Sequence, residues 1–181
     1  MVKNKKIILG VTGSIAAYKS GDIIRRLREK GFDVSVVLTQ EAERFITPLT
    51  LKSLSGNPIH RDMFDAADDS WEMGHIALGQ QAAVLLIAPA TANIIGKIAC
   101  GLADDLLSCL ALATKAKILI APAMNDQMYS NGIVQENLAK LKKFGIQIID
   151  PVTGELACGT FGLGHLAEID DIVNAVVQAA K

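Results

Sequence analysis

The chain has 181 residues, half of them hydrophobic, and its 18 basic and 19 acidic side chains give a formal net charge of −1. This balance excludes the strong positive field that recruits nucleic acid or an anionic membrane surface. A chain of this length and apolar content can bury its own core, which excludes an intrinsically disordered protein and predicts one domain over residues 1–181.

The chain start and the longest apolar runs predict a cytoplasmic protein without membrane spans. The stretch Ile7–Val11 is shorter than a signal-peptide core, which needs about 7 to 15 residues. The run Ala82–Ala90 contains a proline and falls well short of the roughly 20 residues that cross a bilayer. The three cysteines, Cys100, Cys109 and Cys158, are odd in number and lack Cys-x-x-Cys spacing, so we expect neither a disulfide framework nor a metal site.

Apolar, β-branched runs alternate with helical patterns along the chain, which is typical of repeated βαβ units. In chain order, the predicted elements are strand Lys6–Val11, helix Ser14–Glu29, strand Asp33–Leu38, strand Ala83–Ala88, helix Thr91–Cys100, helix Ala103–Ala113, strand Lys117–Ala121, helix Val134–Phe144, strand Ile146–Ile149 and helix Ile169–Ala180. The polar, poorly periodic stretch Gly56–Met73 is predicted to be a long loop or short helices. Right-handed crossovers between such units give a three-layer, Rossmann-like, doubly wound parallel sheet.

Two of these predicted helices carry further expectations. Helix Ser14–Glu29 places Ile15 on one apolar stripe with Ile23, Ile24 and Leu27, and Lys30-Gly31 ends it. Cys100 and Cys109 fall within apolar helical patterns, which predicts that both are small core residues.

Two segments of the chain resemble each other. Residues 85–93 and 118–125 both run from an apolar strand into Ala-Pro-Ala and then to an asparagine, Asn93 and Asn125. Proline cannot donate to a ladder and is expected to end each strand, at the edge where open α/β sheets bind ligands. Proline and asparagine also form ordinary turns, but their repetition favours a ligand-binding edge.

The turn Gly10–Tyr18 leads from the first strand into the first helix, with Gly13 and Ser14 at the helix start. Free backbone N–H groups and the helix dipole suit a phosphate there. The turn has neither the Gly-x-Gly-x-x-Gly pattern nor a P-loop lysine, which disfavours a dinucleotide or Walker site and leaves a mononucleotide phosphate. A glycine turn with Ser14 as helix N-cap is the simpler interpretation and is compatible with phosphate binding.

Two residues are candidates for catalysis. His75 follows the long polar stretch, and an imidazole that titrates near neutral pH suits a general base, although a lone histidine is usually structural. Cys158 lies in the glycine-rich segment Gly154–Glu168, which is predicted to be a flexible flap carrying a free thiol. His60 is predicted to be exposed in a loop, and neither it nor His165 has metal-ligand spacing.

At these motifs the sequence resembles the homo-oligomeric flavin-containing cysteine decarboxylases, and within them the phosphopantothenoylcysteine decarboxylases of coenzyme A biosynthesis. The resemblance spans the whole chain and rests on five motifs in order: Gly13–Ala17, His75, Pro89–Asn93, Pro122–Asn125 and the Cys158 segment, which resembles a substrate-recognition clasp. It implies a flavoprotein-type Rossmann-like fold with FMN as cofactor. The implied activity is that of a carbon–carbon lyase, the decarboxylation of 4′-phosphopantothenoylcysteine to 4′-phosphopantetheine.

The resemblance also implies roles for individual residues. His75 would assist substrate oxidation as a base or orienter, Cys158 would donate a proton in the final reduction, and Asn125 would bind the substrate carboxylate through its amide. The clasp would contribute Glu155, Leu156, Ala157 and His165 to substrate binding. The FMN would be held by Gly13, Ser14, Ile15, Thr39, Thr91, Ala92, Asn93, Ile94 and Ala123.

Three positions depart from the pattern of the family. Thr91 stands in place of the usual serine and keeps a hydroxyl, and Ile94 stands where threonine is usual. His165 occupies the clasp position that typically holds arginine. Because a histidine is only partly charged near neutral pH, we expect an altered substrate affinity or pH dependence but the same reaction.

The resemblance implies a homo-oligomer, either a trimer with FMN at the subunit interface or a dodecamer of stacked trimers. Because two-domain bacterial relatives continue into a phosphopantothenate–cysteine ligase, we expect either a stand-alone decarboxylase with a separate ligase or a piece of a two-domain protein. Three alternatives remain: a flavin prenyltransferase, a peptidyl-cysteine decarboxylase that stops at the enethiol, and a non-catalytic subunit that binds a phosphatase. Cys158 argues against the first two, and His75 together with Cys158 argues against the third.

Overall fold

The computed structural model describes residues 5–63, 79, 82–155, 159 and 161–181. Within them, six parallel strands form one sheet in the order β3-β2-β1-β4-β5-β6. The strands are β1 (Lys6–Val11), β2 (Asp33–Leu38), β3 (Ile59–His60), β4 (Ala82–Ala90), β5 (Lys117–Pro122) and β6 (Gln147–Ile148). A separate antiparallel hairpin pairs β7 (Val152–Glu155) with β8 (Phe161–His165).

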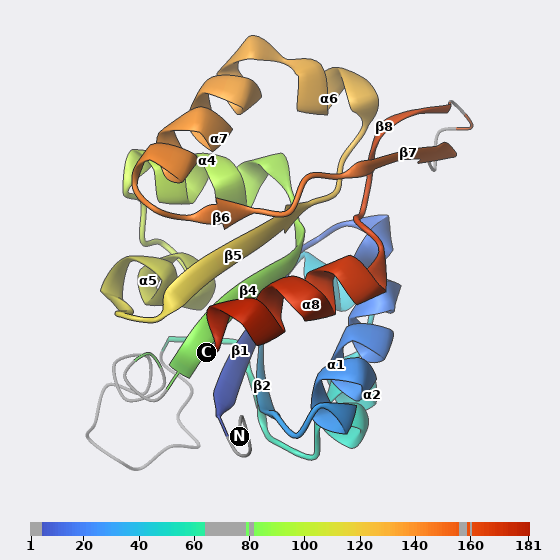
Figure 1. Ribbon diagram of the computed structural model, residues 1–181, viewed down its shortest axis with the longest axis vertical. Coiled ribbons are helices and arrows are strands. Elements are labelled where there is room, and N and C mark those ends of the chain that lie inside the picture. The colour runs from blue at the N-terminus through green and yellow to red at the C-terminus, as the bar shows by residue number, and fades with distance from the viewer. Residues whose placement is uncertain (1–4, 64–78, 80–81, 156–158, 160) are drawn as a thin grey trace.

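Helices cover both faces of the sheet, so the predicted three-layer α/β fold is confirmed (Figure 1). The helices are η1 (Ile15–Lys19) and η2 (Ala42–Arg44), which are 3₁₀ turns, and α1 (Ser20–Glu29), α2 (Pro48–Ser55), α4 (Ala92–Cys100), α5 (Leu106–Ala113), α6 (Asp126–Ser130), α7 (Gly132–Lys143) and α8 (Ile169–Ala179). No helix among these described residues is long and apolar enough to cross a membrane.

Alternation along the strands divides the core into two layers. Ile7 and Leu9 of β1 point to one face and pack with α1, α2 and α8, whereas Ile8 points to the other face, which α4, α5 and α7 cover. The four central strands, β1, β2, β4 and β5, are mostly buried on both faces, which is why their sequences are largely apolar.

The order of the strands determines where ligands can bind. From β1 the chain moves outward to β2 and β3, and then returns to place β4 on the other side of β1. The crossovers on the two sides of this point leave in opposite directions, so a crevice opens at the carboxyl ends of β1 and β4. Both predicted binding motifs, the Gly13 turn and the Thr91 turn, directly follow these two strands.

Several sequence-based predictions need correction. The helix predicted over Ser14–Glu29 is instead the 3₁₀ turn η1 followed by α1. Ile15 is consequently off the apolar stripe, and 58% of it is exposed. Strand β4 runs through Pro89 to Ala90, because the ladder to β5 shifts its register between Ile87 and Ala90 and so accommodates a residue that cannot donate. Cys100 is exposed and Cys109 half-buried, so neither is a core residue.

Other elements were absent from the prediction. Neither α2 nor α6 was predicted from the sequence. The edge strand β3 falls within the predicted loop Gly56–Met73, of which residues 64–73 lie outside the described residues. His60 in β3 is half-buried and not exposed. The segment Gly154–Glu168, predicted to be a flexible flap, includes the paired strand residues of β7 and β8, which were not predicted, whereas its residues 156–158 and 160 lie outside the described residues. Its glycines hide the period-two pattern by which a strand is recognised.

Candidate active site

A cavity of about 550 Å³ lies at the carboxyl ends of β1, β4 and β5. It brings together nine predicted site residues from four separate segments of the chain, namely Gly13, Ser14, Ile15, Thr91, Ala92, Ala123, Asn125, Glu155 and His165. A cavity of this volume is within the usual range for small-molecule sites.

Thr12 holds together the two strands on which the cavity is built. Its buried hydroxyl donates to Pro89 O at 2.7 Å and accepts the Thr91 N–H at 3.1 Å, so both of its hydrogen-bonding functions are used between β1 and β4. The buried Ser20 hydroxyl adds a bond of 3.3 Å to Ala88 O. These bonds fix the relative positions of the Gly13 turn and the start of α4.

Two hydroxyl side chains cap the helices that face the cavity. Ser14 Oγ accepts the Ala16 N–H at 3.3 Å, and Thr91 Oγ1 accepts the Ile94 N–H at 3.5 Å. The predicted N-cap at Ser14 is therefore confirmed, and Thr91 has the same role for α4. A hydroxyl that accepts one backbone N–H still has its own hydrogen to donate, for example to a phosphate oxygen.

Asn125 is the N-cap of α6, and its Oδ1 accepts the Gln127 N–H at 2.9 Å. Because the carbonyl oxygen of the side-chain amide is used in this bond, the orientation of the amide is fixed within the cavity lining. The resulting arrangement suits recognition of an acceptor by the amide nitrogen, which can only donate.

The hairpin is attached to the end of β5 through its backbone. Met124 N donates to Gly164 O of β8 at 3.0 Å. The neighbouring residue Ala123 is bonded to β4 instead, since its N–H donates to Ala90 O at 3.0 Å. Gly164 has a φ of 155°, and a Cβ at this position would collide with Met124 O. Glycine is thus required where β8 crosses the loop after β5, and this close crossing places Glu155 and His165 beside Asn125 in one cavity lining.

Three predicted cofactor residues lie elsewhere. Asn93 is exposed and Ile94 is buried in the core, and neither lines the 550 Å³ cavity. Thr39 lines a second cavity, of about 810 Å³, together with Glu41 and Lys97. The two cavities adjoin, because Gly13 packs so tightly against Glu41 that a Cβ on the glycine would lie 2.5 Å from the glutamate Cβ.

Four predicted site residues, His75, Leu156, Ala157 and Cys158, lie outside the described residues. Conversely, the 550 Å³ cavity is also lined by Lys19, Tyr18 and Met128, which were not selected from the sequence. Tyr18 ends the predicted turn Gly10–Tyr18 and Lys19 follows it, so their closeness to Ser14 in the sequence could have identified both as site residues. Met128 lies in α6, which was not predicted.

No group of three or more His, Cys, Asp or Glu residues in the described part of the chain could hold a metal ion.

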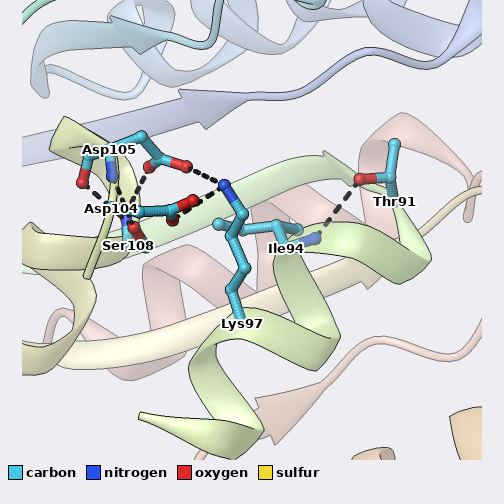
Figure 2. A network of polar contacts seen from close by, with 6 residues as sticks. All are labelled: Thr91, Ile94, Lys97, Asp104, Asp105 and Ser108. Carbon is cyan, nitrogen blue, oxygen red and sulfur yellow. Dashed lines mark hydrogen bonds and ion pairs between the residues drawn. The ribbon is translucent and has the colours of Figure 1, made fainter. Parts of the chain in front are cut away.

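Lys97, in the wall of the second cavity, belongs to a structural ion-pair network (Figure 2). Its Nζ lies 2.8 Å from Asp104 Oδ1 and 2.7 Å from Asp105 Oδ2. Burial disfavours the charged forms of Lys97 and Asp105. The hydrogen bonds of the ion-pair network outweigh this effect, so the pKa of Lys97 is raised and the pKa of Asp105 is lowered. Asp105 also caps α5 by accepting the Ser108 N–H at 2.8 Å, which is why this helix begins at Leu106 and not at Ala103.

Replacement of Asp105 by alanine is expected to lower the free energy of unfolding at pH 7 by about 1 to 2 kcal/mol, the usual value of an N-cap. Because folding lowers the pKa of Asp105, its contribution is present above the unfolded pKa of about 3.9 and is lost as the pH falls through the folded value. Urea unfolding at pH 7 and at pH 3 should therefore show the difference between wild type and Asp105→Ala shrinking at acid pH. Asp105→Asn keeps the cap and should cost less, so equal losses for the two variants would contradict this assignment.

Comparison with known proteins identifies the family. The family model described as Flavoprotein matches residues 1–181, and the chain belongs to this family. A probable phosphopantothenoylcysteine decarboxylase from Streptococcus mutans is 45% identical over 176 residues, which cover 96% of this chain and 98% of that protein. The coenzyme A biosynthesis bifunctional protein CoaBC from Vibrio vulnificus is 49% identical over 164 residues, covering 91% of this chain but 41% of that protein. The chain thus spans less than half the length of this relative.

Two solved structures share the fold over nearly the whole chain. A cysteine-to-serine mutant of a PPC decarboxylase, complexed with pantothenoylaminoethenethiol, has a TM-score of 0.85 at 32% identity and covers 97% of this chain and 98% of that one. The FMN-dependent cysteine decarboxylase SpaF has a TM-score of 0.87 at 32% identity, with complete coverage of both chains. The class of the protein is therefore a flavoprotein of α/β fold similar to cysteine decarboxylases.

Proposed function

We propose that this chain is an FMN-dependent decarboxylase that converts 4′-phosphopantothenoylcysteine to 4′-phosphopantetheine. The observation that carries the proposal is the convergence of four motif segments on one cavity, with Asn125 and the hairpin residue His165 both in its lining. The similarity to the Streptococcus mutans protein, over nearly the full length of both chains, supports this substrate among those of cysteine decarboxylases.

The residues present fit a flavin mononucleotide. Ser14 and Thr91 place hydroxyls in the cavity beside the first turn of α4, where free N–H groups and the helix dipole favour a phosphate. Thr39 Oγ1 is buried without a hydrogen-bond partner among the described residues, and such an orphaned hydroxyl is accounted for if a bound group accepts from it. We propose these residues, with Gly13, Ile15, Ala92 and Ala123, as the cofactor site, and we extend it to Asn93 and Ile94 on the resemblance alone.

A cysteinyl carboxylate loses carbon dioxide only if the departing electron pair has an acceptor. FMN held by these residues would supply reversible two-electron redox chemistry: oxidation of the substrate thiol to a thioaldehyde would give a hydride to the flavin and the thiol proton to a base, and the hydride would be available to reduce the enethiol that decarboxylation leaves. Asn125 would hold the carboxylate through its amide nitrogen and release it as the charge leaves. The apolar residues Ile15, Ala123 and Met124 in the cavity lining would help to exclude water.

Proton transfers are assigned to residues outside the described part of the chain. We propose that His75 is the base or orienter of the oxidation, and that Cys158 donates the proton that completes the reduction of the enethiol. Leu156 and Ala157 would complete the clasp with Glu155 and His165. The resemblance further supports a homo-oligomer, trimer or dodecamer, acting in the cytoplasm, with the ligase reaction on a separate polypeptide or segment.

The test is incubation of the purified protein with 4′-phosphopantothenoylcysteine, followed by mass analysis of the product and of the released cofactor. The expected results are carbon dioxide, 4′-phosphopantetheine and FMN. A peptide ending in cysteine serves as the second substrate. Turnover of the peptide alone would support a peptidyl-cysteine decarboxylase instead, and recovery of only FAD or a nicotinamide nucleotide would refute the cofactor assignment.

A further inference from the structure

Lys19 and His165 meet in the 550 Å³ cavity although they are far apart in the sequence. Lys19 ends η1 and His165 ends β8, and the lysine Nζ lies 3.4 Å from the histidine Nε2. Both side chains are half-buried and both line the cavity. The ends of two separate elements therefore place a cation at one wall of the proposed active site.

The second ring nitrogen of His165 determines the polarity of this contact. His165 Nδ1 lies 3.1 Å from Leu166 O, and since a carbonyl oxygen can only accept, Nδ1 carries the hydrogen. In the neutral ring Nε2 is then an acceptor directed toward the lysine ammonium. His165 is thus a positioning residue that holds the Lys19 side chain at the cavity wall without neutralising its charge.

Lys19 differs from Lys97, the other partly buried lysine of the site region, in having no carboxylate of the described residues beside it. Lys97 has carboxylates of Asp104 and Asp105 within 2.8 Å, whereas no described carboxylate lies within the 4.0 Å ion-pair distance of Lys19. Glu155 lines the same cavity, yet it is exposed and outside that distance. A half-buried ammonium with no carboxylate of the described residues beside it is a position where a bound anion can supply the counter-charge.

The substrate under the proposed function carries two anionic groups, a carboxylate and a phosphate monoester. Asn125 is the proposed partner of the carboxylate, and the hydroxyls of Ser14 and Thr91 are the proposed partners of the cofactor phosphate. Lys19 is the only lysine or arginine in the described lining of this cavity. A phosphate dianion is the group that most requires a full positive charge, which an amide or hydroxyl cannot provide.

We propose that Lys19, positioned by His165, binds the phosphate monoester of the substrate and is the residue that distinguishes phosphorylated from dephosphorylated substrate. This inference rests on the proposed function, and it adds a specificity-determining residue to it. The pair acts on affinity and not on bond breaking, so its loss raises KM more than it lowers kcat.

The test compares 4′-phosphopantothenoylcysteine with pantothenoylcysteine in the FMN-loaded protein. Lys19→Met is expected to lower the ratio of kcat/KM for the phosphorylated over the dephosphorylated substrate at least about tenfold, through KM. Lys19→Arg should restore most of the ratio, because it returns the charge. Lys30→Met is the matched control, since Lys30 is an exposed lysine at the end of α1 and lies outside the cavity.

Calorimetric titration with the two products, 4′-phosphopantetheine and pantetheine, measures the same preference without turnover and keeps the test decisive if one substrate reacts too slowly. An unchanged preference in Lys19→Met overturns the inference. So does a loss of affinity for FMN but not for riboflavin, which would assign Lys19 to the cofactor phosphate. Failure of the wild type to convert either substrate would instead refute the proposed function, and the two failures are therefore distinguishable.

Discussion

Asn125→Asp is expected to lower kcat/KM for 4′-phosphopantothenoylcysteine by about 100-fold or more while leaving the folding stability nearly unchanged. The amide nitrogen that we propose as the donor to the substrate carboxylate becomes a second carboxylate oxygen. Two like charges placed against each other cost several kcal/mol, and each 1.4 kcal/mol corresponds to a factor of ten. The effect should appear as lost substrate binding and slower reduction of the flavin by substrate, both measured by stopped-flow absorbance.

The structure explains why stability should be spared. Asn125 caps α6 through its Oδ1, and aspartate is an equally good N-cap that also complements the positive helix end. Asn131→Asp provides a matched control, because Asn131 caps α7 in the same way, with Oδ1 accepting the Ile133 N–H at 3.0 Å, but is exposed and outside the cavity lining. If both variants kept wild-type kcat/KM, Asn125 would be only a helix cap.

Sequence patterns predicted best those parts of the fold in which one local signal decides the outcome. The five main strands and most helices follow from apolar runs and caps, and the first helix ends at Lys30-Gly31, where the glycine was expected to place its end. The 3₁₀ turn at Ile15 was missed because an apolar residue next to a glycine turn fits a helical stripe in sequence, whereas in the structure it lines the cavity.

In the candidate site, too, the residues set by a local sequence signal could be predicted, and the contacts that depend on distant segments could not. Residues within one motif, such as Ser14 or Asn125, could be selected from their position after a strand. The Lys19–His165 contact could not, because it depends on how β8 crosses the loop after β5, and this crossing depends on the absence of a side chain at Gly164. Thr39 was selected by resemblance alone, and it lies in the adjoining cavity, where its orphaned hydroxyl is the only observation that bears on the role.

Cys158→Ser should convert the enzyme from multiple turnovers to about one turnover per flavin, with the overall rate of 4′-phosphopantetheine formation lowered by at least about 100-fold, which is the usual contribution of a positioned proton donor. A free thiol has a pKa of about 8.5, whereas an alcohol scarcely ionises near neutral pH, so serine keeps the size of the side chain but not its acidity. In the proposed order of events, oxidation and decarboxylation precede the proton transfer, so carbon dioxide should still be released. The accumulating product should lack two hydrogen atoms relative to 4′-phosphopantetheine, and the flavin should remain reduced.

Two controls make this result specific to Cys158. Cys100→Ser makes the same chemical change at an exposed thiol at the end of α4, outside both cavity linings, and should leave turnover unchanged. The flavin of Cys158→Ser should still be bleached by substrate at the wild-type rate, since the proposed oxidation does not use this thiol. If Cys158→Ser formed 4′-phosphopantetheine at the wild-type rate, another group would have to supply the proton. The absence of any bleaching would place the thiol before the decarboxylation step, where the proposed order of events does not allow it.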